Sequence, residues 1–245
     1  MTPSNDEPGD RPLIEMVAAG IADEVRNPLN ALQINVRILE QELATKIPDR
    51  SEHVYSVLAK ITNELTSLDN FVSEFLRYAR PPRLKLEQVN VRPLLHDLAT
   101  FIGPECAKKG VRLTLSLEAG PPVMAADNFQ LKHAVLNLLL NSLQATDAGG
   151  NVTLATGGDA TQLTIEVEDD AEGIPEDVLG RVYDVFFTMR EGGTGLGLPI
   201  ARRIVEEHGG TLSIKSQRGI GTTSSVRPPT GSDASTASAF SRRGR

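Results

Sequence analysis

The 245-residue chain has no tryptophan and a single cysteine, Cys106. One cysteine excludes an intrachain disulfide and a zinc site built from cysteines. Aromatic residues make up only 4% of the chain, which argues against an aromatic stacking platform for nucleic acid. The formal net charge of −7 also disfavours non-specific binding to DNA or to an anionic membrane. We therefore expect no nucleic-acid partner.

The sequence also lacks any apolar run of about 18 residues, the length that a membrane-spanning helix requires. Its polar N-terminal residues lack the apolar segment of a secretory signal. We therefore expect no membrane span and a cytoplasmic location. Residues 1–10 and 231–245 are rich in small and polar residues, and this composition predicts a disordered N-terminus and a disordered tail.

Two apolar stripes come first along the chain, over residues 14–43 and 54–79, with steps of mostly three and four residues. This spacing predicts two long helices joined by a turn at residues 46–50. Prolines 81 and 82 end the second helix and mark a domain boundary. A two-helix hairpin seldom buries a continuous apolar seam by itself, so we expect residues 11–82 to form a dimeric four-helix bundle.

From residue 83 onward the pattern mixes helices with strands. This mixture predicts an α+β fold in which residues 83–230 form an α/β two-layer sandwich. The helices are expected at residues 92–109, 128–145 and 200–208, and the strands at residues 111–117, 151–156, 162–168, 211–216 and 222–227.

A glycine-rich stretch, residues 191–201, stands immediately before the last predicted helix. Glycines allow close backbone approach, and the N–H groups at a helix start favour an anion. The stretch lacks the Lys-Ser/Thr ending of a P-loop, which excludes that mechanism. Taken alone, it is equally compatible with a flexible loop.

The context of this loop favours a nucleotide. Asn137 and Asn141 lie four residues apart, on one face of a predicted helix, and amide oxygens are ligands that Mg²⁺ accepts. Asp169 follows a predicted strand, where its carboxylate can accept a hydrogen bond from the exocyclic amine of adenine. Two aromatic residues, Phe186 and Phe187, lead into the glycine loop.

In this order, the motifs resemble the ATP-binding domain of sensor histidine kinases, the Bergerat fold. Residues 20–32 resemble the dimerisation and phosphoacceptor helix of the same family. The resemblance covers about residues 13–229. It implies a two-component signal-transduction protein with ATP and Mg²⁺ as cofactors and a response-regulator receiver domain as partner.

The resemblance also implies roles for individual residues. Asn141 is the implied Mg²⁺ ligand with Asn137 beside it, Asp169 binds adenine and Gly173 shapes that loop. Phe186 and Phe187 anchor a mobile lid, and Lys132 and His133 lie in a region that often contacts phosphates. The other implied nucleotide contacts are Arg190, Gly193, Thr194, Gly195, Leu196 and Gly197.

The chain departs from the family at the acceptor, where Asp23 replaces the phosphoacceptor histidine. A carboxylate is a weaker nucleophile here, and the neighbouring Glu24, the family's base or orienting residue, repels it. We therefore predict that the usual histidine autophosphorylation is lost. Asn27 lies one helical turn further on the same face, where an amide can orient a water for a phosphatase reaction.

A second departure is Ala171, which stands where the adenine loop of the family has a glycine. If that glycine has a positive φ, a Cβ there costs roughly 1 kcal/mol or more. If it lets the backbone approach the nucleotide, the Cβ of Ala171 crowds the ligand, and Glu172 adds charge to the same loop. The sequence therefore predicts weakened ATP binding.

Three readings remain. The first is a histidine kinase-like protein that binds ATP–Mg²⁺ but is defective in autophosphorylation. The second is a non-enzymatic, nucleotide-responsive dimeric scaffold, that is, a pseudokinase, or a response-regulator phosphatase; such a protein could also pair with another histidine kinase. The third, a chaperone-like or topoisomerase-like ATPase, is disfavoured by the helical hairpin.

Overall fold

The computed structural model describes residues 29–30, 32–34, 36–41, 51–79, 83–117, 123–158, 163–190 and 193–228. The predicted terminal tails lie outside these ranges. The chain divides into two compact units, Met1–Pro82 and Arg83–Arg245. Within the described residues, no helix is both long and apolar enough to cross a membrane.

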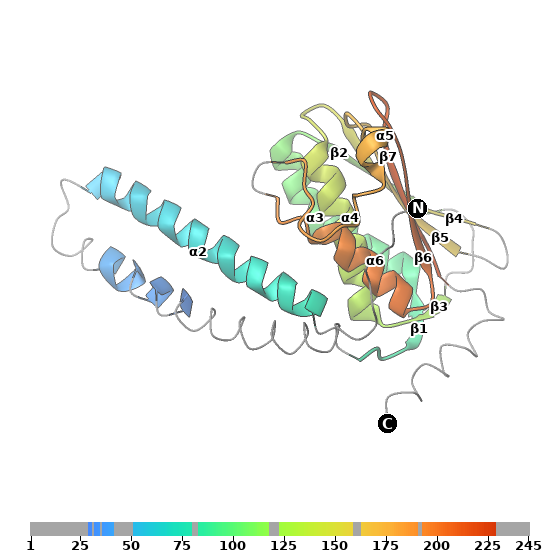
Figure 1. Ribbon diagram of the computed structural model, residues 1–245, viewed down its shortest axis with the longest axis horizontal. Coiled ribbons are helices and arrows are strands. Elements are labelled where there is room, and N and C mark those ends of the chain that lie inside the picture. Colours follow the sequence, from blue (N-terminus) through green and yellow to red (C-terminus); the bar gives the residue numbers. More distant parts are fainter. Residues whose placement is uncertain are drawn as a thin grey trace, which may run out of the picture. The chain divides into compact units, whose positions relative to one another are not determined.

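The first unit contains the long helix α2 (Ser51–Ala79), which has no internal glycine or proline (Figure 1). The described positions between residues 29 and 41 are also helical. In α2, Leu58 is buried, whereas Ile61 and Leu68, which lie one heptad apart, are 41% and 43% exposed. A single copy of the chain therefore covers only part of the predicted apolar seam. The predicted turn at residues 46–50 lies outside the described ranges.

The second unit is built on a five-stranded sheet with the order β2-β4-β5-β7-β6. Strand β2 runs parallel to β4, and every other neighbouring pair is antiparallel. The strands are β2 (Arg112–Leu117), β4 (Asn151–Gly158), β5 (Leu163–Asp169), β6 (Thr211–Gln217) and β7 (Gly221–Arg227). A short ribbon pairs β1 (Glu87–Asn90) with β3 (Val123–Ala126).

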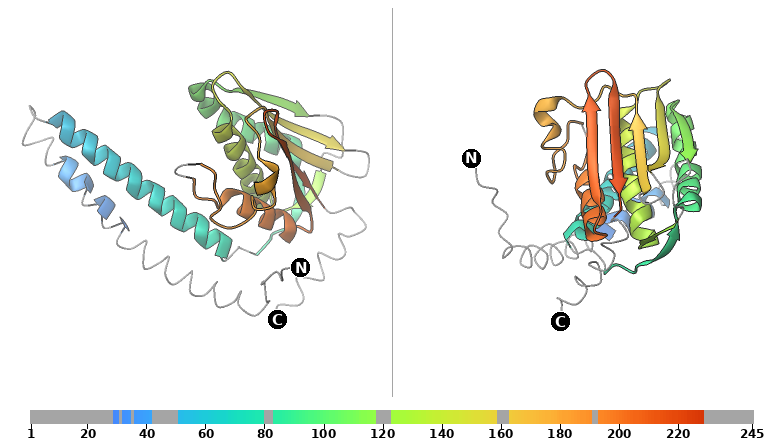
Figure 2. Two further views of the ribbon diagram at one scale, coloured as in Figure 1. Left: turned by 45° about the horizontal axis from the view of Figure 1, so that its top comes forward. Right: turned by 90° about the vertical axis from the view of Figure 1, so that its right-hand side faces the viewer.

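Helices α3 (Val91–Lys109), α4 (Asn128–Ala145) and α6 (Gly197–Glu207) cover one face of this sheet (Figure 2). A one-turn helix, α5 (Glu176–Leu179), follows β5. Strands β2 and β4 alternate between more and less buried positions, as a sheet covered on one face requires, whereas β5 and β7 contain runs of buried residues. The core between the layers includes the fully buried side chains of Leu95, Leu138, Leu139, Leu154, Ile165 and Val167.

This arrangement confirms the predicted α+β fold with a two-layer sandwich. Helix α4 has the predicted bounds, while α6 begins three residues earlier than predicted, at Gly197. The prediction omitted β3 and α5, which have only four residues each and too little periodicity to be detected.

Candidate functional site

Two asparagines of α4 face the first residue of α6. Asn137 is buried, and its Nδ2 donates to the carbonyl oxygen of His133 at 3.1 Å. A Cβ placed on Gly197 would lie 3.4 Å from Asn137 Oδ1 and 3.5 Å from Asn141 Oδ1. The two amide oxygens therefore converge beside a residue that has no side chain. Asn141 Nδ2 is buried without a hydrogen-bond partner, which marks this cradle as a place where a polar ligand fits.

The chemistry of this cradle suits a hard cation that also has phosphate ligands. Among the described residues, no group of three or more His, Cys, Asp or Glu side chains could hold a metal ion. Mg²⁺ characteristically takes few protein ligands and completes its shell with water and phosphate oxygens. Asn137 and Asn141 fit that limited role.

The start of α6 supplies the anion-binding groups. Leu196 is fully buried and stands at the N-cap, where its side chain offers no oxygen to the first turn. The first turn also contains no acidic residue. Its N–H groups and the helix dipole therefore favour a phosphate at this end. Just before it, the Leu196 N–H donates to Thr194 Oγ1 at 3.4 Å.

Two residues before α6 have a left-handed backbone conformation and are hydrogen-bonded to each other. Phe186 has φ 67° and Gly195 has φ 65°, and the Phe186 N–H donates to the Gly195 carbonyl at 3.1 Å. A Cβ on Gly195 would lie 2.7 Å from the Phe186 Cα. A Cβ on Gly193 would collide with Thr188 Oγ1. Gly195 is thus required sterically by the backbone of Phe186, whereas a side chain at Gly193 would have to displace the Thr188 hydroxyl. Residues 186–190 and 193–195 are the described part of the loop before α6.

The side chains of Phe186 and Phe187 have different environments. The guanidinium of Arg181 lies 4.5 Å from the centroid of the Phe187 ring, which is a cation–π contact. The side chain of Phe186 is 52% exposed. The cation–π contact holds the Phe187 ring at the base of the loop.

Asp169 ends β5 on the sheet side of the site. Ser142 Oγ donates to its Oδ2 at 2.7 Å, and the Ala171 N–H donates to its Oδ1 at 3.4 Å. Burial raises the pKa of the Asp169 carboxyl above its ordinary value. Hydrogen bonds from Ser142 and from the backbone of Ala171 and Thr222 oppose that rise, as does the positive charge of Arg190.

Arg190 links the loop to the end of α4. Its Nη1 donates to Gln144 Oε1 and its Nη2 to the carbonyl oxygen of Asn141, both at 2.9 Å. The guanidinium therefore satisfies a carbonyl near the negative end of the helix dipole. Through the Asn141 carbonyl, this cation joins the loop to the helix that carries both asparagines.

In the loop after Asp169, the backbone strain expected at Ala171 is not found. Gly173 has φ 75°, and a Cβ there would collide with the backbone of Gln217. Among the described residues, Phe186 is the one non-glycine residue with positive φ, so Ala171 does not carry the predicted backbone strain. The charge of Glu172 is paired with Arg218 at 3.4 Å.

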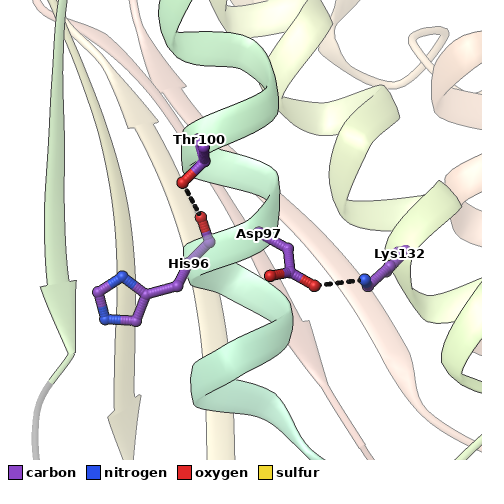
Figure 3. A network of polar contacts seen from close by, with 4 residues as sticks. All are labelled: His96, Asp97, Thr100 and Lys132. Carbon is purple, nitrogen blue, oxygen red and sulfur yellow. Dashed lines mark hydrogen bonds and ion pairs between the residues drawn. The ribbon is translucent and has the colours of Figure 1, made fainter.

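Lys132 is engaged on the other side of α4. Its Nζ lies 2.7 Å from Asp97 Oδ2, which ties α4 to α3 (Figure 3). In the structure this lysine thus binds α3, and His133 contributes its backbone carbonyl to Asn137. The three predicted catalytic residues, Asp23, Glu24 and Asn27, lie outside the described residues.

Sequence reasoning missed Ser142 and Gln144. Both are polar residues that follow Asn141 at the end of a long apolar run, and this interruption was the available signal. Ser142 is 5% exposed and contacts Asp169, while Gln144 contacts Arg190.

Two protein-family models match the chain. The model described as "His Kinase A (phospho-acceptor) domain" matches residues 14–83. The model described as "Histidine kinase-, DNA gyrase B-, and HSP90-like ATPase" matches residues 126–232.

Among curated proteins, Sporulation kinase C of Bacillus subtilis is 32% identical over 218 residues, covering 89% of this chain and 49% of that protein. Sensor histidine kinase ZraS of Escherichia coli is 31% identical over 207 residues, covering 84% of this chain and 43% of that protein. The chain thus spans at most about half the length of these relatives.

Two solved structures match this chain over most of both compact units. Full-length ShkA in complex with AMPPNP matches with a TM-score of 0.76 and 25% identity, covering 88% of this chain and 46% of that chain. ThkA in complex with the response regulator protein TrrA matches with a TM-score of 0.64, covering 87% of this chain and 61% of that chain. At 24% identity, the latter likeness shows the fold alone.

Proposed function

The chain belongs to the sensor histidine kinases of two-component systems, and from this we propose that it binds ATP with Mg²⁺ but lacks histidine autophosphorylation. The observation that carries the nucleotide part is the convergence of Asn137 and Asn141 on Gly197 at the start of α6. The observation that carries the second part is Asp23, which occupies the acceptor position.

The site residues take complementary roles in this proposal. Asn141 and Asn137 hold Mg²⁺ through their amide oxygens, and a bound Mg²⁺ would neutralise phosphate charge. The N–H groups of the first turn of α6 bind the phosphates, and Gly193 and Gly195 let the backbone of the loop close around them. Asp169 accepts a hydrogen bond from the adenine amine.

Other residues of the loop position these groups. Thr194 accepts from the Leu196 N–H just before the helix start, and Gly173 gives the adenine loop its left-handed turn. Phe187 anchors the loop base through Arg181. Arg190 connects the loop to α4 through the Asn141 carbonyl, and we assign it a phosphate-binding role from the family resemblance. Support for ATP as ligand comes from the ATPase family model and from the AMPPNP complex of ShkA.

The proposed loss of autophosphorylation follows from the carboxylate of Asp23 at the position where the family has a phosphoacceptor histidine. A histidine attacks the γ-phosphoryl group through a neutral ring nitrogen, and Glu24 would act as base or orienting group. Asp23 has a shorter side chain than histidine, carries a negative charge, and precedes Glu24 in the sequence. It would also have to approach the negatively charged phosphates of ATP. Coulomb repulsion and reach therefore both oppose phosphoryl transfer to this carboxylate.

We assign dimerisation to residues 11–82. Ile61 and Leu68 on α2 are about two-fifths exposed, and Leu32 and Leu39 are 50% and 48% exposed. In each pair the two residues lie seven apart, the repeat of a helical seam, so a second copy that completes a four-helix bundle would bury them. The complex of ThkA with TrrA supports a response-regulator receiver domain as the further partner.

A response-regulator phosphatase is the second candidate function, because Asn27 lies four residues after Asp23 in the phosphoacceptor-type helix. Its amide can orient a water toward a phospho-aspartyl group on the partner, and this reaction needs no acceptor histidine. A purely non-enzymatic scaffold would bind nucleotide without either reaction. A subunit that pairs with another histidine kinase could instead use its ATP-binding domain to phosphorylate the acceptor histidine of that partner.

A revertant tests the proposal. The full chain and Asp23→His are incubated with γ-labelled ATP and Mg²⁺, and binding of ATP is measured in parallel. We expect both proteins to bind ATP and only Asp23→His to acquire alkali-stable, acid-labile label.

The matched control is Asp23→Asn, which changes the charge without supplying an imidazole and should stay unlabelled. Alkali-stable, acid-labile label on the unmodified chain would contradict the loss of autophosphorylation. Failure of the unmodified chain to bind ATP would contradict the nucleotide part of the proposal.

A further inference from the structure

Ser142 makes a short hydrogen bond to the carboxylate assigned to adenine. It lies on α4 directly after Asn141, is 5% exposed, and places its Oγ 2.7 Å from Asp169 Oδ2. A hydroxyl beside an ionised carboxylate is the donor, because the carboxylate has no hydrogen to give. The distance is typical of a charge-assisted hydrogen bond.

The two carboxylate oxygens of Asp169 therefore differ in their hydrogen bonding. Oδ2 is engaged by Ser142, whereas Oδ1 receives a long 3.4 Å bond from the Ala171 N–H. The backbone of Thr222 also donates to this carboxylate. The neighbouring carboxylate of Asp170 accepts instead from the Asn151 N–H at 2.8 Å. The charged group that acts on Asp169 is Arg190 of the loop. Oδ1 therefore keeps acceptor capacity for a ligand.

We propose that Ser142 is a positioning residue that sets the preference of this site for adenine over guanine nucleotides, by holding Asp169 with Oδ1 presented as an acceptor. This inference rests on the proposed nucleotide-binding function. Adenine carries an amino group at the position where guanine carries a carbonyl oxygen. An acceptor held at this point pairs with the amine and repels the carbonyl.

The preference depends on the ionisation of Asp169. A protonated Asp169 could donate to the guanine carbonyl, so the discrimination would fall as the carboxyl takes up a proton. Burial raises the pKa of Asp169, and the hydrogen bond from Ser142 opposes that rise. Without Ser142, the pKa rises further, and the ionised form is lost at a higher pH.

The test measures the dissociation constants of ATP and GTP, each with Mg²⁺, for the full chain by calorimetry between pH 5.5 and 8. At pH 7 we expect Ser142→Ala to weaken ATP binding about ten-fold, since a hydrogen bond to a charged group contributes roughly 1.5 to 3 kcal/mol. GTP binding should be unchanged. The pH below which ATP affinity falls (the acid limb of ATP binding) should move to a higher value in Ser142→Ala. Ser142→Thr, which keeps the hydroxyl, should restore both the ATP affinity and the position of the acid limb.

Thr146→Val is the matched control. Thr146 is 1% exposed, and its Oγ1 donates to the Ser142 carbonyl at 2.8 Å rather than to Asp169. This variant also deletes one buried hydroxyl near the end of α4, and we expect it to leave the ATP-to-GTP ratio and the acid limb unchanged. A matching change in Thr146→Val would overturn the inference, because the effect would then follow from helix packing.

The remaining outcomes separate this inference from its premise. Equal losses of ATP and GTP affinity in Ser142→Ala, or an unchanged ratio and acid limb, would overturn the role of Ser142 while leaving nucleotide binding intact. If the unmodified chain bound neither nucleotide, the proposed function itself would fail and the inference with it.

Discussion

At the scale of single residues, the space available to a side chain at position 197 is limited by Asn137 and Asn141. A Cβ at this position would lie between 3.3 and 3.5 Å from three amide atoms of Asn137 and Asn141. The residue also opens α6, where the backbone must come close to a bound phosphate. A methyl group here would press on these amides and shift them by a few tenths of an ångström, although the φ of Gly197 is not positive.

We predict that Gly197→Ala weakens ATP–Mg²⁺ binding at least about ten-fold, because the new methyl group displaces the asparagine amides from their converging positions. Calorimetry with ATP and Mg²⁺ measures the effect. The folded protein should persist, because alanine is the better helix former.

Gly103→Ala is the matched control, since Gly103 is also helical and a Cβ there meets no atom within 4 Å. It should leave ATP binding unchanged and raise the free energy of unfolding by about 0.5–1 kcal/mol. Equal ATP affinity in Gly197→Ala and the unmodified chain would contradict the assigned cradle.

Among the single-residue predictions, the shared helix face of Asn137 and Asn141 is seen in the structure, because spacing alone carried that information. Asn137 and Asn141 lie four apart on one helix, and helical geometry puts them on one face. The strain predicted at Ala171 was wrong, because the left-handed turn falls at Gly173. The contact between Ser142 and Asp169 was not predictable, because it joins residues 27 positions apart on different elements.

At the scale of secondary-structure elements, α3 is clamped to the end of α4 by one lysine. Lys109 Nζ donates to the carbonyl oxygens of Leu143 and Gln144 at 2.8 and 2.9 Å. These carbonyls belong to the last turn of α4, where no intrahelical donor is available. The clamp thus supports the end of the helix that carries Asn141 and the Arg190 contact.

We predict that Lys109→Met lowers the free energy of unfolding by about 1 kcal/mol, because it leaves two helix-terminal carbonyls without this donor while keeping the aliphatic stem. Chemical denaturation of the full chain measures the loss. A secondary decrease in ATP affinity should follow, since the end of α4 becomes less ordered.

Lys108→Met serves as the comparison, because Lys108 is the adjacent lysine and makes only an exposed ion pair to Glu105 at 4.0 Å. Such pairs contribute little, so its unfolding free energy should stay unchanged. If both variants were equally stable, the clamp would have no energetic role.

Elements were predicted well where they were long or strictly alternating. Helix α3 begins at Asn90, whose side chain accepts from the Arg92 N–H, and ends at Gly110 with φ 75°; both signals are visible in the sequence. Helix α6 was placed too late because its first turn contains Gly197 and Pro199 and follows a glycine-rich segment, and this composition favours a loop. That turn is helical because Leu196 is buried in the core.

At the scale of the whole molecule, the partly exposed apolar residues of the first unit provide a surface that a second copy would bury in the proposed dimer. Ile61 and Leu68 share one face of α2 at heptad spacing, while Leu58 on the same helix is buried. Two chains together would remove this apolar surface from water, at roughly 25 cal/mol per Å² of area buried. The proposed dimer follows from that gain.

We predict that the double variant Ile61→Glu, Leu68→Glu shifts the protein from dimer to monomer, because a second copy would have to bury two unpaired carboxylates. Analytical ultracentrifugation measures the shift. ATP binding should be kept, because the nucleotide residues lie in the other compact unit.

Ser67→Glu is the control, since Ser67 is exposed on α2 outside the apolar seam and its substitution should leave the dimer intact. A dimer that survived the double variant would place the interface elsewhere on the chain.

The sequence by itself determined the family and the α+β class, because helical and strand periodicities and short motif spacings are local properties of the chain. It also supplied the residues that we propose for the nucleotide site and for the acceptor position, Asp23 among them, because these proposals depend on residue identity and spacing. Only the tertiary structure decided that the amides of Asn137 and Asn141 meet Gly197, that Ser142 engages Asp169, and that Lys132 binds α3. These contacts join residues distant in sequence, and packing of helices on the sheet brings them within hydrogen-bonding distance.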